Sequence, residues 1–189
     1  PEPVDVAWEI AQDEAFTQIV RTGVERALPG QGHSVHAEIH GLPAGRTFFY
    51  RFHARGVTSP AGRAMTAPAY GAGLDRMKIA WASCAHYEQG FFHAYGDMAD
   101  ERPDLIIHTG DYIYESSWGP QVRRHVVPEP YTLEDYRLVH ALYRLDPDLQ
   151  AAAAIAPWLV TWDDHEVDND YAGDVSEQPF VSLEDFRAR

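Results

Sequence analysis

The feature that most constrains the fold is a strand–helix–strand pattern between residues 77 and 111. "MKIAWAS" is a continuous apolar run without alternation, which is typical of a strand buried on both faces. "FFHAYGDMADE" carries an apolar stripe at helical spacing, and Pro103 ends it. "DLIIHTGD" is a second apolar run. Such a β–α–β unit requires a parallel strand pair joined by a right-handed crossover.

Two helices and a third strand are predicted beyond this unit. Thr132, with Asp135 three residues later, forms a near capping box for a helix over "LEDYRLVHALYRL". The pair Asp146-Pro147 begins a second helix, "PDLQAAAAIA". "PWLVTW" then reads as a third buried strand. We therefore predict an α/β domain over residues 77–189.

Residues 1–70 have a different pattern, in which apolar and polar residues alternate as in half-buried strands. Turn sequences such as "LPGQGH", "GLPAGR" and "TSPAGR" separate the alternating stretches. We predict four or five strands of an antiparallel sandwich here, followed by a linker at residues 71–76. The apolar positions that define the expected strand faces are Val4, Val6, Trp8 and Ile10, then Val35, Ala37 and Ile39, then Phe48, Tyr50 and Phe52.

Composition excludes several classes of partner. The net charge of −14 argues against nucleic-acid or anionic-membrane binding through a basic surface. No apolar run is long enough for a transmembrane helix, and the first residues show no signal peptide. The single cysteine, Cys84, leaves no intrachain disulfide.

Each of the three predicted strands of the α/β domain ends in residues that can bind a metal. Ligands of open α/β sheets bind at the carboxyl ends of the parallel strands. Taken singly, these residues have ordinary readings as a buried cysteine, a turn aspartate, a packing tyrosine or a solvated acidic loop. Their recurrence at three strand ends favours one dinuclear metal site. The residues are Ser83 and Cys84, then Asp111 and Tyr114, then Asp163, Asp164, His165 and Glu166.

The residue types indicate two unlike cations. A carboxylate can bridge two metals, which suits Asp111. Thiolate and phenolate groups such as Cys84 and Tyr114 stabilise a ferric ion, whereas the oxygens of Asp164 suit calcium, magnesium or manganese. His165 can protonate a leaving alkoxide or donate a hydrogen bond to a phosphate.

The motifs "ASCAHYEQGFFHAY", "PDLIIHTGDYIYE", "YTLEDYRLVHALYRLDPDLQAA" and "PWLVTWDDHEVDNDYAG" resemble the alkaline phosphatase D (PhoD-like) family. That family belongs to the calcineurin-like metallophosphoesterases and is akin to purple acid phosphatases. The resemblance covers nearly the whole chain, and it implies that residues 1–70 are a partial immunoglobulin- or fibronectin III-like module. Where that module usually has a corner tyrosine, this chain has Phe48.

The resemblance also implies roles for individual residues. Cys84 and Tyr114 correspond to iron ligands, and Asp111 corresponds to the bridging aspartate of G-D-x-x-Y. Asp164 takes the place of the asparagine in the superfamily's N-H-[DE] motif, and His165 takes the place of its histidine. Asp164 and His165 are thus the implied catalytic residues.

Asn169, in "VDND", is a further implied metal ligand, and together with His165 an implied phosphate contact. The implied activity is hydrolysis of phosphate monoesters by metal-activated water. The implied cofactors are Fe³⁺ and a divalent cation, with calcium favoured and magnesium or manganese as alternatives. Small-molecule or polymeric phosphate esters would be the substrates, and the full-length protein is expected to be a monomer.

Relatives are typically exported by the twin-arginine route, so the resemblance implies a periplasmic, secreted or cell-surface enzyme. Superfamily members take further metal ligands from later strands, and this sequence stops at "EDFRAR". We therefore expect an internal fragment of a longer protein. Alone, it should bind at most one metal weakly and hydrolyse nothing.

Other functions remain open on the sequence. A phosphodiesterase acting on phospholipids or teichoic-acid-like polymers would share these motifs. A catalytically inactive binding protein would be favoured by loss of Asp111 or Asp164, and both are present. A mononuclear non-haem iron oxygenase would need two histidines and one carboxylate on one face, and the strand ends lack that pattern.

Overall fold

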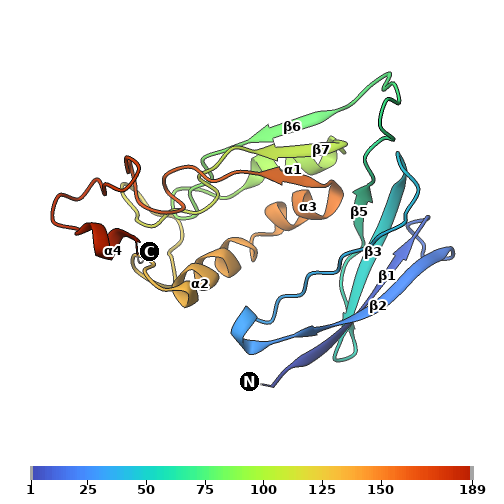
Figure 1. Cartoon of the computed structure of the whole chain (residues 1–189), viewed down its shortest axis with the longest axis horizontal. Coiled ribbons are helices and arrows are strands. Elements are labelled where there is room, and N and C mark those ends of the chain that lie inside the picture. The colour runs from blue at the N-terminus through green and yellow to red at the C-terminus, as the bar shows by residue number, and fades with distance from the viewer. Residues whose placement is uncertain (1, 188–189) are drawn as a thin grey trace. The chain divides into compact units, whose positions relative to one another are not determined.

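The computed structural model describes residues 2–187, which divide into two compact units (Figure 1). The first unit contains the chain up to Lys78 together with the short segment Ala153–Pro157. The second contains Ile79–Ala152 and the chain from Trp158 onward.

The first unit is built on one antiparallel sheet of five strands. Its order is β2-β1-β3-β4, and β5 also pairs with β3. A single turn of 3₁₀ helix, η1 (Pro29–Gln31), follows β2. The strands are β1 (Val4–Ala11), β2 (Ile19–Ala27), β3 (Thr47–Ala54), β4 (Val57–Thr58) and β5 (Gly62–Met65).

The central strands of this sheet place most of their aromatic side chains on one face, as the alternation predicts, and Phe49 lies on the other. Trp8 pairs with Phe52, and Ile10 pairs with Tyr50, so these four side chains point to the same side. The indole of Trp8 lies against Gly23 of β2, where no side chain could fit. The β1–β3 pair is therefore the basis of the core of this unit.

The strand predicted around Val35, Ala37 and Ile39 is wrong. These three residues are half-buried and the residues between them are exposed, so the alternation reports correctly which side chains turn inward. The segment forms no strand, because it lies against the aromatic face of the sheet and not along one of its edges. It instead contributes to the walls of a cavity of about 320 Å³ against the aromatic face of the sheet. Within residues 2–187 this unit therefore has one sheet and not the two of a sandwich.

The second unit contains the three predicted strands, which form a parallel sheet in the order β6-β7-β8 (Figure 1). Helix α1 connects β6 to β7, and α2 and α3 precede β8. None of the described helices has the length and apolar character needed to cross a membrane. The elements are β6 (Ile79–Ala82), α1 (His93–Asp100), β7 (Leu105–His108), α2 (Leu133–Tyr143), α3 (Pro147–Ile155), β8 (Trp158–Val160) and α4 (Leu183–Arg187).

Both predicted helix starts are confirmed. Thr132 Oγ1 accepts the Asp135 N–H at 3.2 Å, and Asp135 Oδ2 accepts the Thr132 N–H at 2.9 Å, which completes a capping box for α2. Asp146 Oδ1 accepts the backbone N–H groups of Asp148 and Leu149 at 3.0 and 3.2 Å, so it caps α3. Caps of this kind each contribute about 1 kcal/mol.

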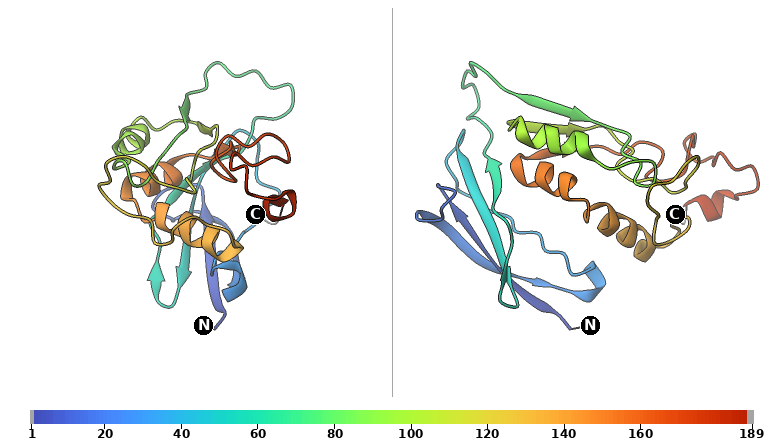
Figure 2. Two further views of the ribbon diagram at one scale, coloured as in Figure 1. Left: turned by 90° about the vertical axis from the view of Figure 1, so that its left-hand side faces the viewer. Right: turned by 180° about the vertical axis from the view of Figure 1, so that it is seen from behind.

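The faces of the parallel sheet differ in burial. Helix α1 covers one face (Figure 2), where His108 Nε2 lies 3.0 Å from the Tyr95 hydroxyl and Trp158 stacks on both rings. On the other face Trp81 is 73% exposed and Leu159 is 60% exposed. The prediction that all three strands are buried on both faces is therefore wrong for β6 and β8 in this chain, because the described helices leave this face uncovered.

Candidate metal centre

The turns that follow β6 and β7 carry two of the predicted ligands and are hydrogen-bonded to each other. The Cys84 N–H donates to the Gly110 carbonyl at 3.2 Å, and the Ala85 N–H donates to the Asp111 carbonyl at 2.9 Å. Cys84 and Asp111 both adopt left-handed backbone, with φ of 57° and 54°. This conformation costs a non-glycine residue about 1–2 kcal/mol, and such strain is concentrated at functional sites.

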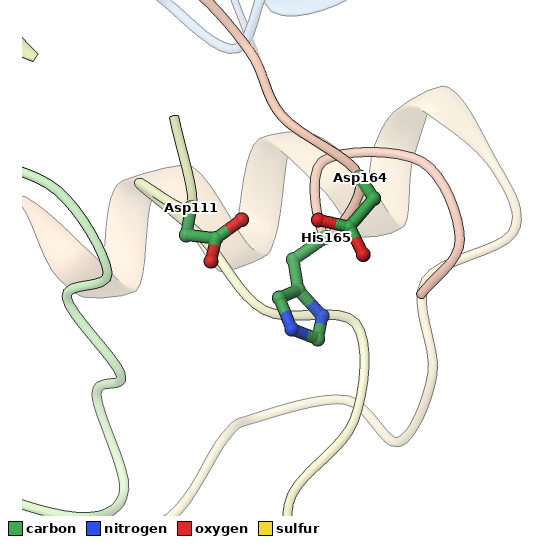
Figure 3. A group of neighbouring side chains, drawn as sticks. All are labelled: Asp111, Asp164 and His165. Carbon is green, nitrogen blue, oxygen red and sulfur yellow. The ribbon is translucent and has the colours of Figure 1, made fainter. Parts of the chain in front are cut away.

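Three predicted residues converge at the ends of β7 and β8. One potential ligand atom each of Asp111, Asp164 and His165 lies within 4.8 Å of the others. Figure 3 shows Asp164 and His165 on one loop, facing Asp111 on the other. Asp111 Oδ1 is buried and accepts no hydrogen bond from residues 2–187. A buried carboxylate oxygen without a donor requires compensation, and a cation would supply it.

Tyr114 and Cys84 lie beside this cluster. The Tyr114 hydroxyl donates to Asp111 Oδ2 at 3.2 Å. Burial raises the pKa of Tyr114, and the neighbouring Asp111 carboxylate and Cys84 side chain raise it further. Cys84 itself is exposed and borders a cavity of about 490 Å³. The phenol is therefore neutral in the metal-free protein, and binding it as a phenolate requires a cation.

The imidazole of His165 is held in one orientation. Its Nδ1 lies 2.8 Å from Glu115 Oε2, and both side chains are almost completely buried. The ring also contacts the aromatic rings of Tyr114 and Trp118, at centroid distances of 4.2 and 5.7 Å. The hydrogen bond to Glu115 assigns the proton to Nδ1, so Nε2 carries the lone pair that can accept a proton and afterwards donate it.

Asp164 and Asn169 are connected through the loop that follows β8. Asp164 Oδ2 accepts the Asp170 N–H at 2.6 Å. Although burial raises the pKa of Asp164, this hydrogen bond and other backbone donors lower it below its usual value, so the carboxylate is ionised at neutral pH. The Asn169 amide donates to Glu177 Oε2 at 2.7 Å. Its role as a ligand or phosphate contact stays a prediction.

Glu166 differs from the sequence expectation. It was grouped with the metal-binding residues at the end of the third strand, but it is outside the Asp111–Asp164–His165 cluster. Its carboxylate accepts backbone N–H groups from the turn after β7 and from its own loop. Sequence alone does not separate these roles, because a carboxylate serves equally well as metal ligand and as hydrogen-bond acceptor.

Sequence reasoning also missed Glu115 and Trp118. Glu115 directly follows the G-D-x-x-Y motif, and this adjacency is the signal that could have found it. Acidic residues beside a strand end are common, however, and only the fold brings Glu115 to His165. Trp118 belongs to the irregular segment between β7 and α2, where no periodicity indicates its direction.

Two family models match this chain. A family model described as PhoD-like phosphatase matches residues 79–189, and a model of its N-terminal domain matches residues 1–68. The chain belongs to the PhoD-like phosphatase family. This result confirms the resemblance identified from the motifs.

Among PhoD-like phosphatases, the chain is similar to alkaline phosphatase D of Bacillus subtilis (strain 168), with 49% identity over 183 residues. That match covers 93% of this chain and 31% of the relative. A solved structure titled "Structure of PhoD" aligns with a TM-score of 0.93 and 47% identity, over 98% of this chain and 36% of the other. The chain thus spans about a third of the length of each relative.

Proposed function

We propose that the full-length protein containing this chain hydrolyses phosphate monoesters at a dinuclear metal site. Cys84, Asp111 and Tyr114 would hold Fe³⁺. Asp111 and Asp164, with Asn169, would hold the divalent cation, which we expect to be calcium, with magnesium or manganese as alternatives. The observation that carries the proposal is the convergence of Asp111, Asp164 and His165 in a chain of the PhoD-like phosphatase family.

The donor set fits two unlike cations. A phenol and a thiol beside one oxygen of Asp111 suit a ferric ion, and the carboxylate of Asp164 suits a hard divalent cation. The donorless Asp111 Oδ1 and the Oδ2 that meets the Tyr114 hydroxyl lie on one carboxylate. That carboxylate can therefore serve both cations.

The two cations would supply a lowered pKa of bound water and compensation of phosphate charge. Without them the carboxylates around the site would repel an anionic substrate. His165, held at Nδ1 by Glu115, presents Nε2 as the group that holds or delivers a proton at the leaving oxygen. Rigid placement of this imidazole is the contribution of Glu115.

The test compares turnover of p-nitrophenyl phosphate and of its bis ester by the purified full-length protein, with its metal content measured in parallel. We expect faster monoester turnover that is lost on chelation and restored by iron with calcium. Faster diester turnover would instead support the phosphodiesterase alternative. A protein that contains both metals and hydrolyses neither ester would contradict the proposal.

For the N-terminal unit we propose a partial immunoglobulin- or fibronectin III-like module over residues 1–70, a linker at 71–76, and the catalytic domain from 77. The antiparallel sheet and the lack of helix or strand between Met65 and Ile79 support this division. Limited proteolysis should cut first within 71–76, and first cleavage inside either domain would contradict it.

We also propose that the full-length protein is exported and acts as a monomer. Phosphatase activity should then appear outside the cytoplasm of the native host, and the purified protein should sediment as one chain. Activity confined to the cytoplasm, or a stable dimer, would contradict the respective part.

A further inference from the structure

The carboxylate of Glu166 accepts hydrogen bonds from backbone N–H groups of two segments that are far apart in the sequence. Its Oε2 accepts the N–H of Asp111 at 3.0 Å and the N–H of Asp163 at 2.7 Å. Its Oε1 accepts the N–H of Tyr112 in a short hydrogen bond and, more weakly, that of Ile113 at 3.4 Å. One half-buried carboxylate therefore bonds to the turn after β7 and to the loop after β8.

The turn after β7 is shaped to receive such a carboxylate. Gly110 has φ of 104° and Asp111 has φ of 54°, which turns the next N–H groups toward one point. Successive N–H groups arranged in this way form a concavity that binds anions. Charge-assisted hydrogen bonds donated by these N–H groups to the carboxylate offset the strain at Asp111, and without an acceptor each buried N–H would carry a desolvation penalty.

The same two segments are also in direct backbone contact. A Cβ added to Gly110 would lie 2.5 Å from the backbone nitrogen of Asp163 and 3.0 Å from its Cα. The hydrogen bonds of Glu166 therefore connect two segments whose backbones are already in contact at Gly110 and Asp163. Asp111 lies on one side of this interface and Asp164 on the other.

We propose that Glu166 is a positioning residue that clamps the turn after β7 against the loop after β8. Its oxygens are engaged by backbone N–H groups, so it orients the carboxylate of Asp111 toward that of Asp164 and binds no cation itself. The clamp belongs to the fold and is present without metal. Its consequence for cation affinity rests on the proposed function.

The decisive variant is Glu166→Gln in the full-length protein, with Glu134→Gln as a matched control. Glutamine has the same shape, but its amide offers one acceptor oxygen and places an NH₂ group against N–H donors. Glu134 is exposed on α2, so its replacement removes the same charge without affecting the clamp.

The first measurement is amide hydrogen exchange of residues 111–113, which donate to Glu166, in the metal-free proteins. In Glu166→Gln these amides should exchange about tenfold faster or more, because their acceptor is weakened. They should keep the wild-type rate in Glu134→Gln and in Asp111→Asn. Wild-type exchange in Glu166→Gln would overturn the clamp, whether or not the enzyme hydrolyses phosphate esters.

The second measurement is metal retention against increasing chelator. Glu166→Gln should release its cations about 10–100-fold more readily than wild type, the range seen for residues that orient metal ligands. Faster exchange at residues 111–113 with wild-type metal retention would overturn the positioning role.

Glu166→Asp is the second variant, in case Glu166→Gln does not fold. It retains the charge but withdraws the carboxylate by one methylene, so it cannot reach both segments. Intermediate exchange and intermediate metal retention are expected, and wild-type values for both would overturn the proposal.

Discussion

The turns after β6 and β7 both hold a candidate ligand in left-handed backbone, but they are fixed in opposite ways. The turn after β7, the central strand, is held by hydrogen bonds from its backbone N–H groups to the carboxylate of Glu166. The chain after β6, an edge strand, is held by the guanidinium group of Arg123, which lies between β7 and α2. Arg123 Nε donates to the Tyr87 carbonyl at 2.5 Å, and the guanidinium lies 3.7 Å from the centre of the Tyr87 ring.

Arg123 connects this edge segment to the start of helix α3. Its Nη1 lies 2.6 Å from Asp146 Oδ2, and the two side chains are 13% and 3% exposed. Asp146 also caps α3, as described above. The central turn is therefore bonded to the loop after β8 through Glu166, whereas the edge turn is bonded to the central turn and, at Tyr87, to Arg123 of the segment between β7 and α2. We infer that Asp111 is the more rigidly held candidate ligand and Cys84 the more adjustable one.

The largest effect should come from the central turn. Asp111→Asn retains the left-handed turn, because asparagine tolerates this conformation, and removes the charge that balances two cations. We expect loss of both metals or of nearly all activity in the full-length enzyme, measured by elemental analysis and turnover. Full metal occupancy together with wild-type turnover would show that Asp111 does not bridge.

Arg123→Met should have the next largest effect, because it removes the side chain that connects the segment after β6 to Asp146. It leaves the Asp146 carboxylate buried without its partner, so the free energy of unfolding should fall by about 3–5 kcal/mol in denaturant titrations. Arg124→Met, at an exposed neighbour, is the control and should change it by less than about 0.5 kcal/mol. Equal losses of unfolding free energy in the two variants would show that Arg123 does not stabilise the segment after β6.

This pair also predicts a pH dependence. Burial raises the pKa of Asp146, but the hydrogen bond and charge of Arg123 outweigh it, so the pKa in the folded protein is lowered. The stabilisation is complete above the unfolded pKa of about 3.9 and is lost as the pH falls through the lower folded value. The stability difference between wild type and Arg123→Met should therefore shrink only in strong acid.

Tyr114→Phe should leave the fold intact and lower the free energy of unfolding by about 1 kcal/mol, for one lost hydrogen bond. It should also remove the visible absorption that a ferric phenolate gives to the iron-loaded full-length protein. An iron-loaded wild type without such a band would refute Tyr114 as a ligand.

The smallest effect is expected for Cys84→Gly at the edge turn. Glycine adopts the left-handed conformation without strain, and the cysteine is exposed, so the metal-free full-length protein should change in stability by less than about 1 kcal/mol. Iron should be held more weakly. A destabilisation above about 3 kcal/mol would show that the edge turn is as rigid as the central one.

The sequence predicted the parts of the fold that depend on local pattern. The parallel strands and the caps Thr132 and Asp146 follow from apolar runs and capping residues, and all are confirmed. The strand around Val35 was wrong, because alternation gives the inward side but not the hydrogen-bonding partner. Strand β2 was missed, since its inward positions include Gly23 and Glu25, which do not read as an apolar face.

The sequence predicted which residue types form the candidate site and at which strand ends they lie. The convergence of Asp111, Asp164 and His165 follows from the rule that ligands gather at the carboxyl ends of parallel strands. The role of Glu166 was not predictable, because it depends on the φ angle of Asp111, which no sequence pattern specifies.

Gly110 sets a limit on how this sequence can evolve. Its Cα faces the backbone nitrogen and Cα of Asp163, atoms that every amino acid possesses. No replacement at position 163 can therefore make room for a side chain at position 110. A library randomised at both positions should recover glycine at 110 whatever residue occupies 163, so two residues in direct contact should show no covariation.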